Sequence, residues 1–410
     1  MSQAHTLEIE SQETTDEGQM LVVNFGPQHP ATHGTLRCVF YTDGERIVRA
    51  IPDLGYLHTG FEKLAEHMTY AQWMVTTDRM NYFSAICNNI GWAHAIEEFV
   101  GIEVPERAQY IRMILAELAR IAEHFVFVGL LGMDVGAFTG MLWTFKEREK
   151  VYDILDACCG SRLTNTYARI GGLMRDVPTN FKDMVRNFLK TFPETLDDVI
   201  NLLHKNRIFQ KRLQGIGILS KEDAIAYGAC GPVLRASGVE YDIRKDRPYL
   251  KYDEVEFDVP TLEEGDCYAR YWQRILEIRQ SLRIVEQCLQ KLPDKGPIIH
   301  PDYKVGVPQK KDVYTDMESL IHHFKMVMPG HQGQVFPPKE IDFYSATEAP
   351  NGELGFYVVG SGGHIPYRVR IHPPSLKNYQ LYPHLVKGAL IADAVPILAS
   401  LWIIAGELDR

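Results

Sequence analysis

His29 and His33 lie four residues apart in the segment NFGPQHPATHGTLR, residues 24–37. The segment contains two prolines, which exclude a regular helix, so a shaped loop must fix both imidazoles in space. Gly26 and Gly34 flank the pair. A lone histidine is usually structural, but two on a proline-braced loop favour a binding or catalytic site.

A metal would need further ligands, and the next segment offers them. GYLHTGFEKLAEH, residues 55–67, contains His58, Glu62, Glu66 and His67. Imidazole and carboxylate ligands suit zinc or iron. Alternatively, Glu62 belongs to an ordinary exposed helix face.

Asp134 interrupts the apolar stretch 124–143. An isolated buried carboxylate costs several kcal/mol unless it is paired or protonated, which points to a functional role. The alternative is a helix N-cap, because MDVGAFTGM is able to begin a helix. A further candidate is TTDRMNYF, where Arg79 and Tyr82 lie among apolar residues, although a tyrosine there is most often part of the core.

Arg235, Asp242, Arg244 and Lys245 gather in GPVLRASGVEYDIRK, residues 231–245. These charges suggest a phosphate site, but the segment lacks a glycine-rich strand–helix pattern. The chain has no dinucleotide-binding fingerprint, P-loop, nucleophile elbow or zinc motif.

The overall composition narrows the function. The 410 residues carry a net charge of −10, so the whole molecule does not attract nucleic acid. The seven cysteines include no CxxC pair, which fits buried thiols in a reducing compartment.

Patterning predicts an α+β fold that forms one integrated domain. We expect a flexible tail over 1–20, a β-rich region over 21–59 that carries the histidine loop, a helical core over 60–291, and an irregular segment followed by an α/β part over 292–410. Acidic residues interrupt the apolar stretches 124–143 and 390–406, so both read as core elements of a soluble or peripheral protein.

These stretches occur in the order found in the D-subunit, or 49-kilodalton, family of respiratory complex I, the proton-pumping NADH–quinone oxidoreductase. The resemblance covers nearly the whole chain beyond residue 20. The segments that carry it are NFGPQHPATHGTLR, GYLHTGFEK, DRMNYF, RAQYIRMILAELARIAEH, MDVGAFT, FKEREK, YARIGG, LRASGVEYDIRK, FDVP, GDCYARY, RQSLRI, MESLIHHFK, GELGFYVV, PYRVRI and GELDR.

The family resembles the large subunit of nickel–iron hydrogenases without its metal, which implies a hydrogenase-like fold. Hydrogenases hold nickel with two CxxC pairs, and this chain has none, so we expect it to bind no metal or other cofactor itself. The resemblance implies that the former metal cavity takes a quinone headgroup. A partner subunit supplies electrons from a [4Fe–4S] cluster.

The resemblance also assigns roles to individual residues. It implies that His33 and Tyr82 bind the quinone, that Asp134 pairs with His33, and that Arg79 lies beside the cluster. It implies that His29, together with Gly26 and Gly34, shapes the loop. Tyrosine and imidazole suit quinone reduction, which needs two protons, and a nearby carboxylate would favour the imidazolium form of His33.

The family further implies partners and a location. The partners are the iron–sulfur B-subunit, the C-subunit and the membrane-arm subunit that forms the quinone channel. The place is the cytoplasmic side of the bacterial inner membrane, where the chain is peripheral and inactive alone. Two alternatives stay open, namely a complex fed by ferredoxin or another donor, and a scaffold without a catalytic role.

Several positions depart from the family pattern. Asn81 stands where Asp is common, and Trp402 replaces the Asp of the SLD segment that is usual before the last stretch. Thr164 and Asn165 occupy a segment near the cluster where many relatives have a histidine. Without that titratable group we expect a low-potential cluster, which favours menaquinone over ubiquinone as substrate.

Overall fold

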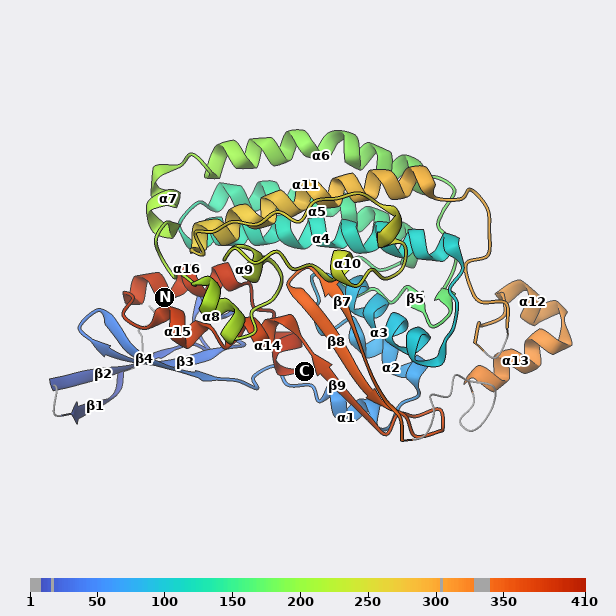
Figure 1. Cartoon of the computed structure of the whole chain (residues 1–410), viewed down its shortest axis with the longest axis horizontal. Helices are drawn as coiled ribbons and strands as arrows, with labels where there is room; N and C mark the ends of the chain where they lie inside the picture. The colour runs from blue at the N-terminus through green and yellow to red at the C-terminus, as the bar shows by residue number, and fades with distance from the viewer. Residues whose placement is uncertain (1–8, 16–17, 303–304, 328–339) are drawn as a thin grey trace, which may run out of the picture.

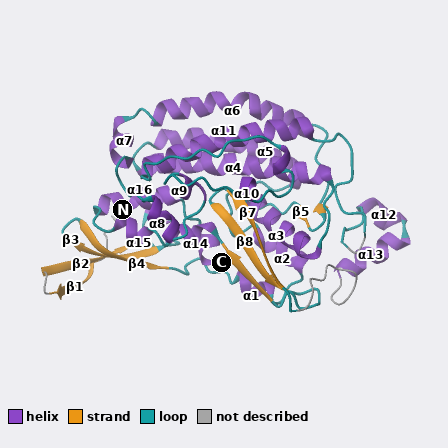
Figure 2. Ribbon diagram, in the orientation of Figure 1, coloured by secondary structure: helices purple, strands orange, loops and turns teal. Residues whose placement is uncertain are grey.

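The computed structural model describes residues 9–15, 18–302, 305–327 and 340–410. Figure 1 shows a layer of long helices above a second layer that contains shorter helices and a three-stranded sheet. A separate antiparallel sheet extends from one end of the molecule, and Figure 2 shows that the longer strands gather in these two sheets. The architecture is α+β, as the patterning predicted.

The upper layer consists of α4 (Glu106–Asp134), α5 (Phe138–Cys159), α6 (Phe181–Leu203) and α11 (Cys267–Lys291). Helix α4 packs against both α5 and α11 and is buried along most of its length. Ile111, Ile114 and Leu118, which recur at helical spacing, are completely buried. The long helix predicted from this periodicity is confirmed.

The sheet at the end of the molecule is an antiparallel meander of β1 (Ile9–Thr15), β2 (Gly18–Phe25), β3 (Arg37–Asp43) and β4 (Arg46–Asp53). The predicted hairpin at Asp43–Gly44 is confirmed, since Asp43 pairs with Arg46 and Gly44 has a φ of 57°. Cys38, Phe40 and Thr42 alternate along β3 as its buried face.

The predicted flexible tail over residues 1–20 is wrong for residues 9–15 and 18–20, because they lie in β1 and β2. A polar sequence is able to form a strand when its backbone pairs with the free edge of a sheet, whatever its side chains. Residues 1–8 and 16–17 lie outside the described part of the chain.

The lower layer contains the antiparallel sheet of β7 (Asp342–Ala349), β8 (Gly352–Val359) and β9 (Arg368–His372). A short pair, β5 (Ala168–Arg169) and β6 (Gly172–Leu173), lies beside α3 and α4. The other described elements are α1 (Phe61–Ala65), α2 (Tyr70–Thr77), α3 (Ala85–Val100), α7 (Arg207–Leu213), α8 (Lys221–Ala226), α9 (Gly231–Arg235), α10 (Ile243–Asp246), α12 (Lys310–Thr315), α13 (Met317–Val327), α14 (Pro374–Tyr379), α15 (Tyr382–Val386), α16 (Ile391–Leu401), α17 (Ala405–Asp409) and the 3-10 turns η1 (Pro30–Thr32) and η2 (Tyr252–Glu254).

The apolar stretches 124–143 and 390–406 fall within α4, α5, α16 and α17 and the turns that join them. Helix α16 packs against α4 and α11, and Ile397 and Leu401 are completely buried. Among the described residues, no helix is both long enough and apolar enough to cross a bilayer. The prediction of core elements is confirmed for 390–406 and for the α4 part of the first stretch, but it is wrong for Phe138, Leu142 and Trp143 on α5, which are exposed.

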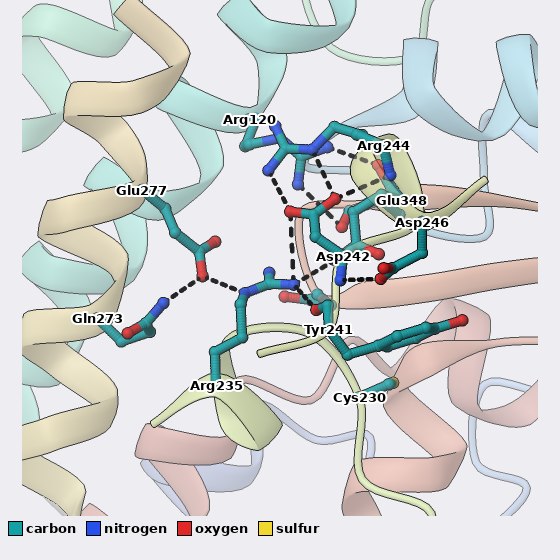
Figure 3. A network of polar contacts seen from close by, with 12 residues as sticks. Arg120, Cys230, Arg235, Tyr241, Asp242, Arg244, Asp246, Gln273, Glu277 and Glu348 are labelled. Atoms are coloured by element: carbon teal, nitrogen blue, oxygen red, sulfur yellow. Dashed lines mark hydrogen bonds and ion pairs between the residues drawn. The ribbon is translucent and has the colours of Figure 1, made fainter. Parts of the chain in front are cut away.

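A network of buried arginines and carboxylates joins the two layers (Figure 3). Arg235 pairs with Glu277 on α11 at 2.8 Å and with Glu348 on β7 at 2.9 Å. Arg244 pairs with Asp242 at 2.7 Å and with Glu117 on α4 at 3.0 Å. The phosphate interpretation of this segment is therefore wrong, because Arg235 and Arg244 are buried and already neutralised by carboxylates.

Candidate functional site

The histidine loop is a tight turn that connects β2 to β3. His29 caps the turn η1, and its Nδ1 accepts a hydrogen bond from Ala31 N at 3.1 Å. The buried Thr32 hydroxyl bonds to the carbonyls of Pro27 and His29, both at 3.0 Å. Gly26 has a φ of 88°, and a Cβ there would lie 2.2 Å from Leu36 O. The loop thus holds its shape through its own contacts, with His29 and Gly26 as the shaping residues.

His33 ends this turn in the left-handed conformation, with a φ of 51°. Its side chain is exposed. Neighbouring protein removes part of the water around the imidazole and lowers its pKa. The expected imidazolium, held charged by a nearby carboxylate, is not supported here, because this partial loss of water and not a carboxylate shifts the pKa of His33.

Tyr82 lies in the short connection between α2 and α3. The side chain is half-buried, and its ring packs against Phe83 with centroids 5.1 Å apart. Within the described part of the chain, its hydroxyl has no hydrogen-bond partner. Burial raises the pKa of Tyr82, and the carboxylates of Glu123 and Glu407 raise it further. The hydroxyl is therefore a neutral donor, able to bond to a ligand.

The C-terminal helix α17 packs against the backbone of the segment that leads to Tyr82. A Cβ at Gly406 would lie 2.5 Å from Met80 O, so the two backbones are in contact. Asp409 accepts hydrogen bonds from Gly55 N at 3.0 Å and from Leu57 N at 2.7 Å. The segment around Tyr82, the loop before α1 and the end of the chain therefore form one structural unit.

Two buried glutamates lie near Tyr82. Glu123, on α4, accepts hydrogen bonds from Asn81 Nδ2 at 3.1 Å and from Trp402 Nε1 at 3.0 Å. Glu407, on α17, bonds to Ser375, and burial raises the pKa of its carboxyl to about 8. The sequence-based prediction missed both, although an acidic residue on the apolar face of a long helix is a signal of the kind that singled out Asp134.

Asp134 is the last residue of α4. The suggestion that it is a helix N-cap is wrong, because α5 begins only at Phe138. Its side chain is half-buried, and burial raises the pKa to about 6. No hydrogen bond or ion pair joins Asp134 to His33 in the described residues, so their pairing stays a prediction.

Arg79 and the segment of Thr164 and Asn165 lie close together. Thr166 Oγ1 donates a hydrogen bond to Asp78 Oδ2 at 3.4 Å, which joins the two segments. The Arg79 side chain is exposed, Thr164 is half-buried, and Asn165 is buried with no hydrogen-bond partner for its Oδ1 in the described region. Arg79 thus provides an exposed cation beside two side chains that do not titrate near neutral pH.

The proposed metal ligands of residues 58–67 are used in other contacts. Glu62 pairs with Arg410 at 3.2 Å and with Arg368 at 3.5 Å, and Glu66 pairs with Arg368 at 2.8 Å. The His58 ring shares a 2.7 Å hydrogen bond with Asp409 O. The described residues contain no group of three or more His, Cys, Asp or Glu side chains that could hold a metal. The contacts of Glu62, Glu66 and His58 therefore do not support a zinc or iron site in this segment.

The cysteines are all unpaired, and most are buried. Burial raises the pKa of Cys38, Cys87 and Cys158 to about 12, so these thiols stay protonated. Such thiols are poor metal ligands, which agrees with the absence of CxxC pairs from the sequence.

A family model described as "Respiratory-chain NADH dehydrogenase, 49 Kd subunit" matches residues 134–410, more than half of the chain. The chain belongs to this family. The recognition from sequence is thus confirmed.

Curated relatives agree with this assignment. Over 95% of the chain and 85% of the relative, it is 49% identical to the D-subunit of NADH-quinone oxidoreductase from Salinibacter ruber. It is 50% identical to a D-subunit of the same enzyme from Chloroherpeton thalassium, over 96% of the chain and 88% of the relative. In Aquifex aeolicus, a protein named as a C/D-subunit is 44% identical over 98% of the chain and 69% of its own length.

Proposed function

We propose that this chain is the quinone-site subunit of a proton-translocating NADH:quinone oxidoreductase. The observation that carries the proposal is the half-buried hydroxyl of Tyr82, which stays neutral and has no hydrogen-bond partner within the described residues. Family membership supports the assignment, since the relatives are named as subunits of this enzyme. The hydrogenase-like ancestry expected from sequence remains part of the proposal.

Reduction of a quinone to a quinol takes two electrons and two protons. The electrons come one at a time from the [4Fe–4S] cluster of the partner subunit. This chain binds the two quinone oxygens through hydrogen bonds and supplies protons. Tyr82 donates a hydrogen bond to one oxygen, because its raised pKa keeps the hydroxyl protonated at neutral pH.

His33 binds the second oxygen as a neutral imidazole, because its pKa is lowered. Asp134 has a pKa of about 6 and exchanges protons near neutral pH. This suits a group that supplies protons to His33 and, through it, to the quinone. Once the quinol has taken its protons, the charge left on this side is a first step toward driving proton translocation.

Partners and location follow from the same proposal. The chain works with the iron–sulfur B-subunit, the C-subunit and the membrane-arm subunit of the quinone channel, on the cytoplasmic side of the bacterial inner membrane. The Aquifex relative named C/D supports the contact with the C-subunit. Without its partners the chain is inactive, because the electron source lies elsewhere.

Menaquinone is the favoured substrate over ubiquinone. Thr164 and Asn165 lie in the segment next to Arg79 and do not titrate near neutral pH. A cluster without a neighbouring imidazole gains no proton when it is reduced, and so keeps a low potential. A low-potential donor matches a low-potential acceptor.

Kinetics of Tyr82→Phe in the assembled complex test the proposal. Loss of one hydrogen bond, which is worth roughly 0.5–1.5 kcal/mol, is expected to raise the KM for a short-chain quinone by up to about tenfold, and loss of the hydroxyl proton is expected to lower kcat. Tyr314→Phe is the control, since Tyr314 is 77% exposed on α12. Wild-type kinetics for Tyr82→Phe would contradict the quinone role and favour a scaffold.

A further inference from the structure

Glu123 differs from most other buried glutamates because no cation forms an ion pair with it in the described part of the chain. Each of Glu97, Glu117, Glu147, Glu277 and Glu348 pairs with an arginine or a lysine. In the described part of the chain Glu123 has no ion pair, and neither does Glu407. The two buried glutamates without a counter-ion are those that influence Tyr82.

Neutral donors hold the Glu123 carboxylate in place. Asn81 Nδ2 lies 3.1 Å and 3.2 Å from its two oxygens, and Trp402 Nε1 lies 3.0 Å from Oε1. The same Asn81 bonds through its Oδ1 to Phe83 N at 3.2 Å, so it orients the backbone on either side of Tyr82. The departures Asn81 and Trp402, noted in the sequence, thus meet at this one carboxylate.

Other groups face Glu123 from every element packed against it. They are Tyr82 and Cys87 before and within α3, Tyr152 on α5, Arg274 on α11 and Glu407 on α17. Burial lowers the pKa of Arg274 to about 9, so it stays charged at neutral pH, and its charge opposes part of the rise in the pKa of Glu123. Burial also raises the pKa of Glu123, which hydrogen bonds reverse only in part.

We propose that Glu123 is a positioning residue of the quinone site, because Asn81 holds its carboxylate beside the segment that carries Tyr82, where its charge opposes loss of the Tyr82 proton. The inference rests on the proposed function and adds a residue to it. While Glu123 is ionised, its charge makes removal of the Tyr82 proton harder. Once Glu123 is protonated, Tyr82 becomes the stronger acid. Proton delivery to the quinone should therefore weaken as the pH rises through the pKa of Glu123.

Exchange of the carboxylate between positions 123 and 81 tests this inference in the assembled complex. Glu123→Gln is neutral at every pH, so the part of the decline in kcat with rising pH that Glu123 causes should disappear. The double variant Asn81→Asp/Glu123→Gln places a carboxylate at position 81, which bonds to position 123, and should restore the decline. The expected effect is about one pH unit in the profile, or about tenfold in kcat at a fixed pH above the decline.

Two further variants separate a specific effect from a structural one. Glu353→Gln is the matched control, because Glu353 accepts a 2.6 Å hydrogen bond from a different tyrosine, Tyr344. It should leave the profile unchanged. If Glu123→Gln does not assemble, Trp402→Phe removes one donor to the charged carboxylate, raises its pKa and should move the decline to higher pH.

The outcomes also distinguish this inference from the proposed function. An unchanged profile in Glu123→Gln, or in Trp402→Phe if only that variant assembles, overturns the role of Glu123. If Tyr82→Phe still raises KM in that case, the proposed quinone site is retained without a role for Glu123. Wild-type kinetics in Tyr82→Phe overturn both, because Glu123 is proposed to act through Tyr82. A decline that is lost in Glu123→Gln and not restored by the double variant also overturns the inference, since the charge alone should carry the effect.

Discussion

Gly406 lies against the backbone of Met80, so that a Cβ at position 406 would lie 2.5 Å from Met80 O and 2.7 Å from Arg79 O. This contact places the C-terminal helix behind the segment that carries Tyr82. Residues more than 300 positions apart in the sequence are therefore in contact next to Tyr82.

Gly406→Ala should disturb this contact. The methyl group would force the two backbones apart, and overpacking of this kind costs about 1–3 kcal/mol. We expect a lower thermal midpoint and a higher KM for quinone in the assembled complex. Gly296→Ala is the control, because a Cβ there meets only ordinary contacts with Arg107 at 3.6 Å or more. Equal behaviour of the two variants would argue against the contact.

His33→Asn should reduce turnover and leave the fold intact. Asparagine tolerates the left-handed backbone that position 33 requires, so the turn persists. The amide retains a donor but does not exchange protons near neutral pH. A neutral imidazole is able to take a proton on one ring nitrogen and give one from the other, and loss of this relay is expected to lower kcat about a hundredfold. His67→Asn, at an exposed position, should behave as wild type in the same assay.

Asp134→Asn should separate stability from turnover. The folded-state pKa of Asp134 is about 6, above its usual 3.8, so the folded protein holds this proton more tightly than the unfolded chain. Stability therefore falls as the pH rises from about 4 to 6, and the cost persists above that range. Above pH 6 the asparagine variant should be more stable by on the order of 1–2 kcal/mol, allowing for solvent.

Turnover of Asp134→Asn should fall although its stability rises. With no titratable group at position 134, coupled quinone reduction is expected to slow although the complex assembles. Asp198→Asn on the exposed face of α6 is the control for removal of a carboxylate. Undiminished coupled turnover in Asp134→Asn would contradict the role proposed for Asp134.

The partner's terminal cluster should have a potential that barely changes with pH. Thr164 and Asn165 provide no proton to couple to its reduction. A redox titration of the cluster in the assembled complex between about pH 6 and 8 measures this directly. A slope of about 59 mV per pH unit would show one proton taken up per electron and refute the argument. Ubiquinone as the only quinone of the source membrane would separately refute the menaquinone assignment.

Much of the fold could be predicted because local patterns decide it. The apolar periodicity of α4 and the Asp43–Gly44 turn are local signals, and both predictions are confirmed. The strand β1 was missed because its pairing depends on a sheet edge formed by other residues. No local pattern in its polar sequence reports that edge.

The candidate site was harder to predict, because distant contacts determine the state of each group. Arg235 pairs with Glu277 and Glu348, which lie on distant segments. Because the sequence does not show these partners, the charges around Arg235 resembled a ligand site. Glu123 appeared as one acidic residue within a long helix. Its role depends on Asn81 and Trp402, which reach it from opposite parts of the chain.

A structure of the assembled complex with a quinone or a quinone-site inhibitor bound tests the central claim most directly. The account predicts one headgroup oxygen within hydrogen-bond distance of Tyr82 Oη, about 2.6–3.2 Å, and the other within that distance of a His33 ring nitrogen. A headgroup bound elsewhere, with the Tyr82 hydroxyl and the His33 imidazole both facing water, would contradict it.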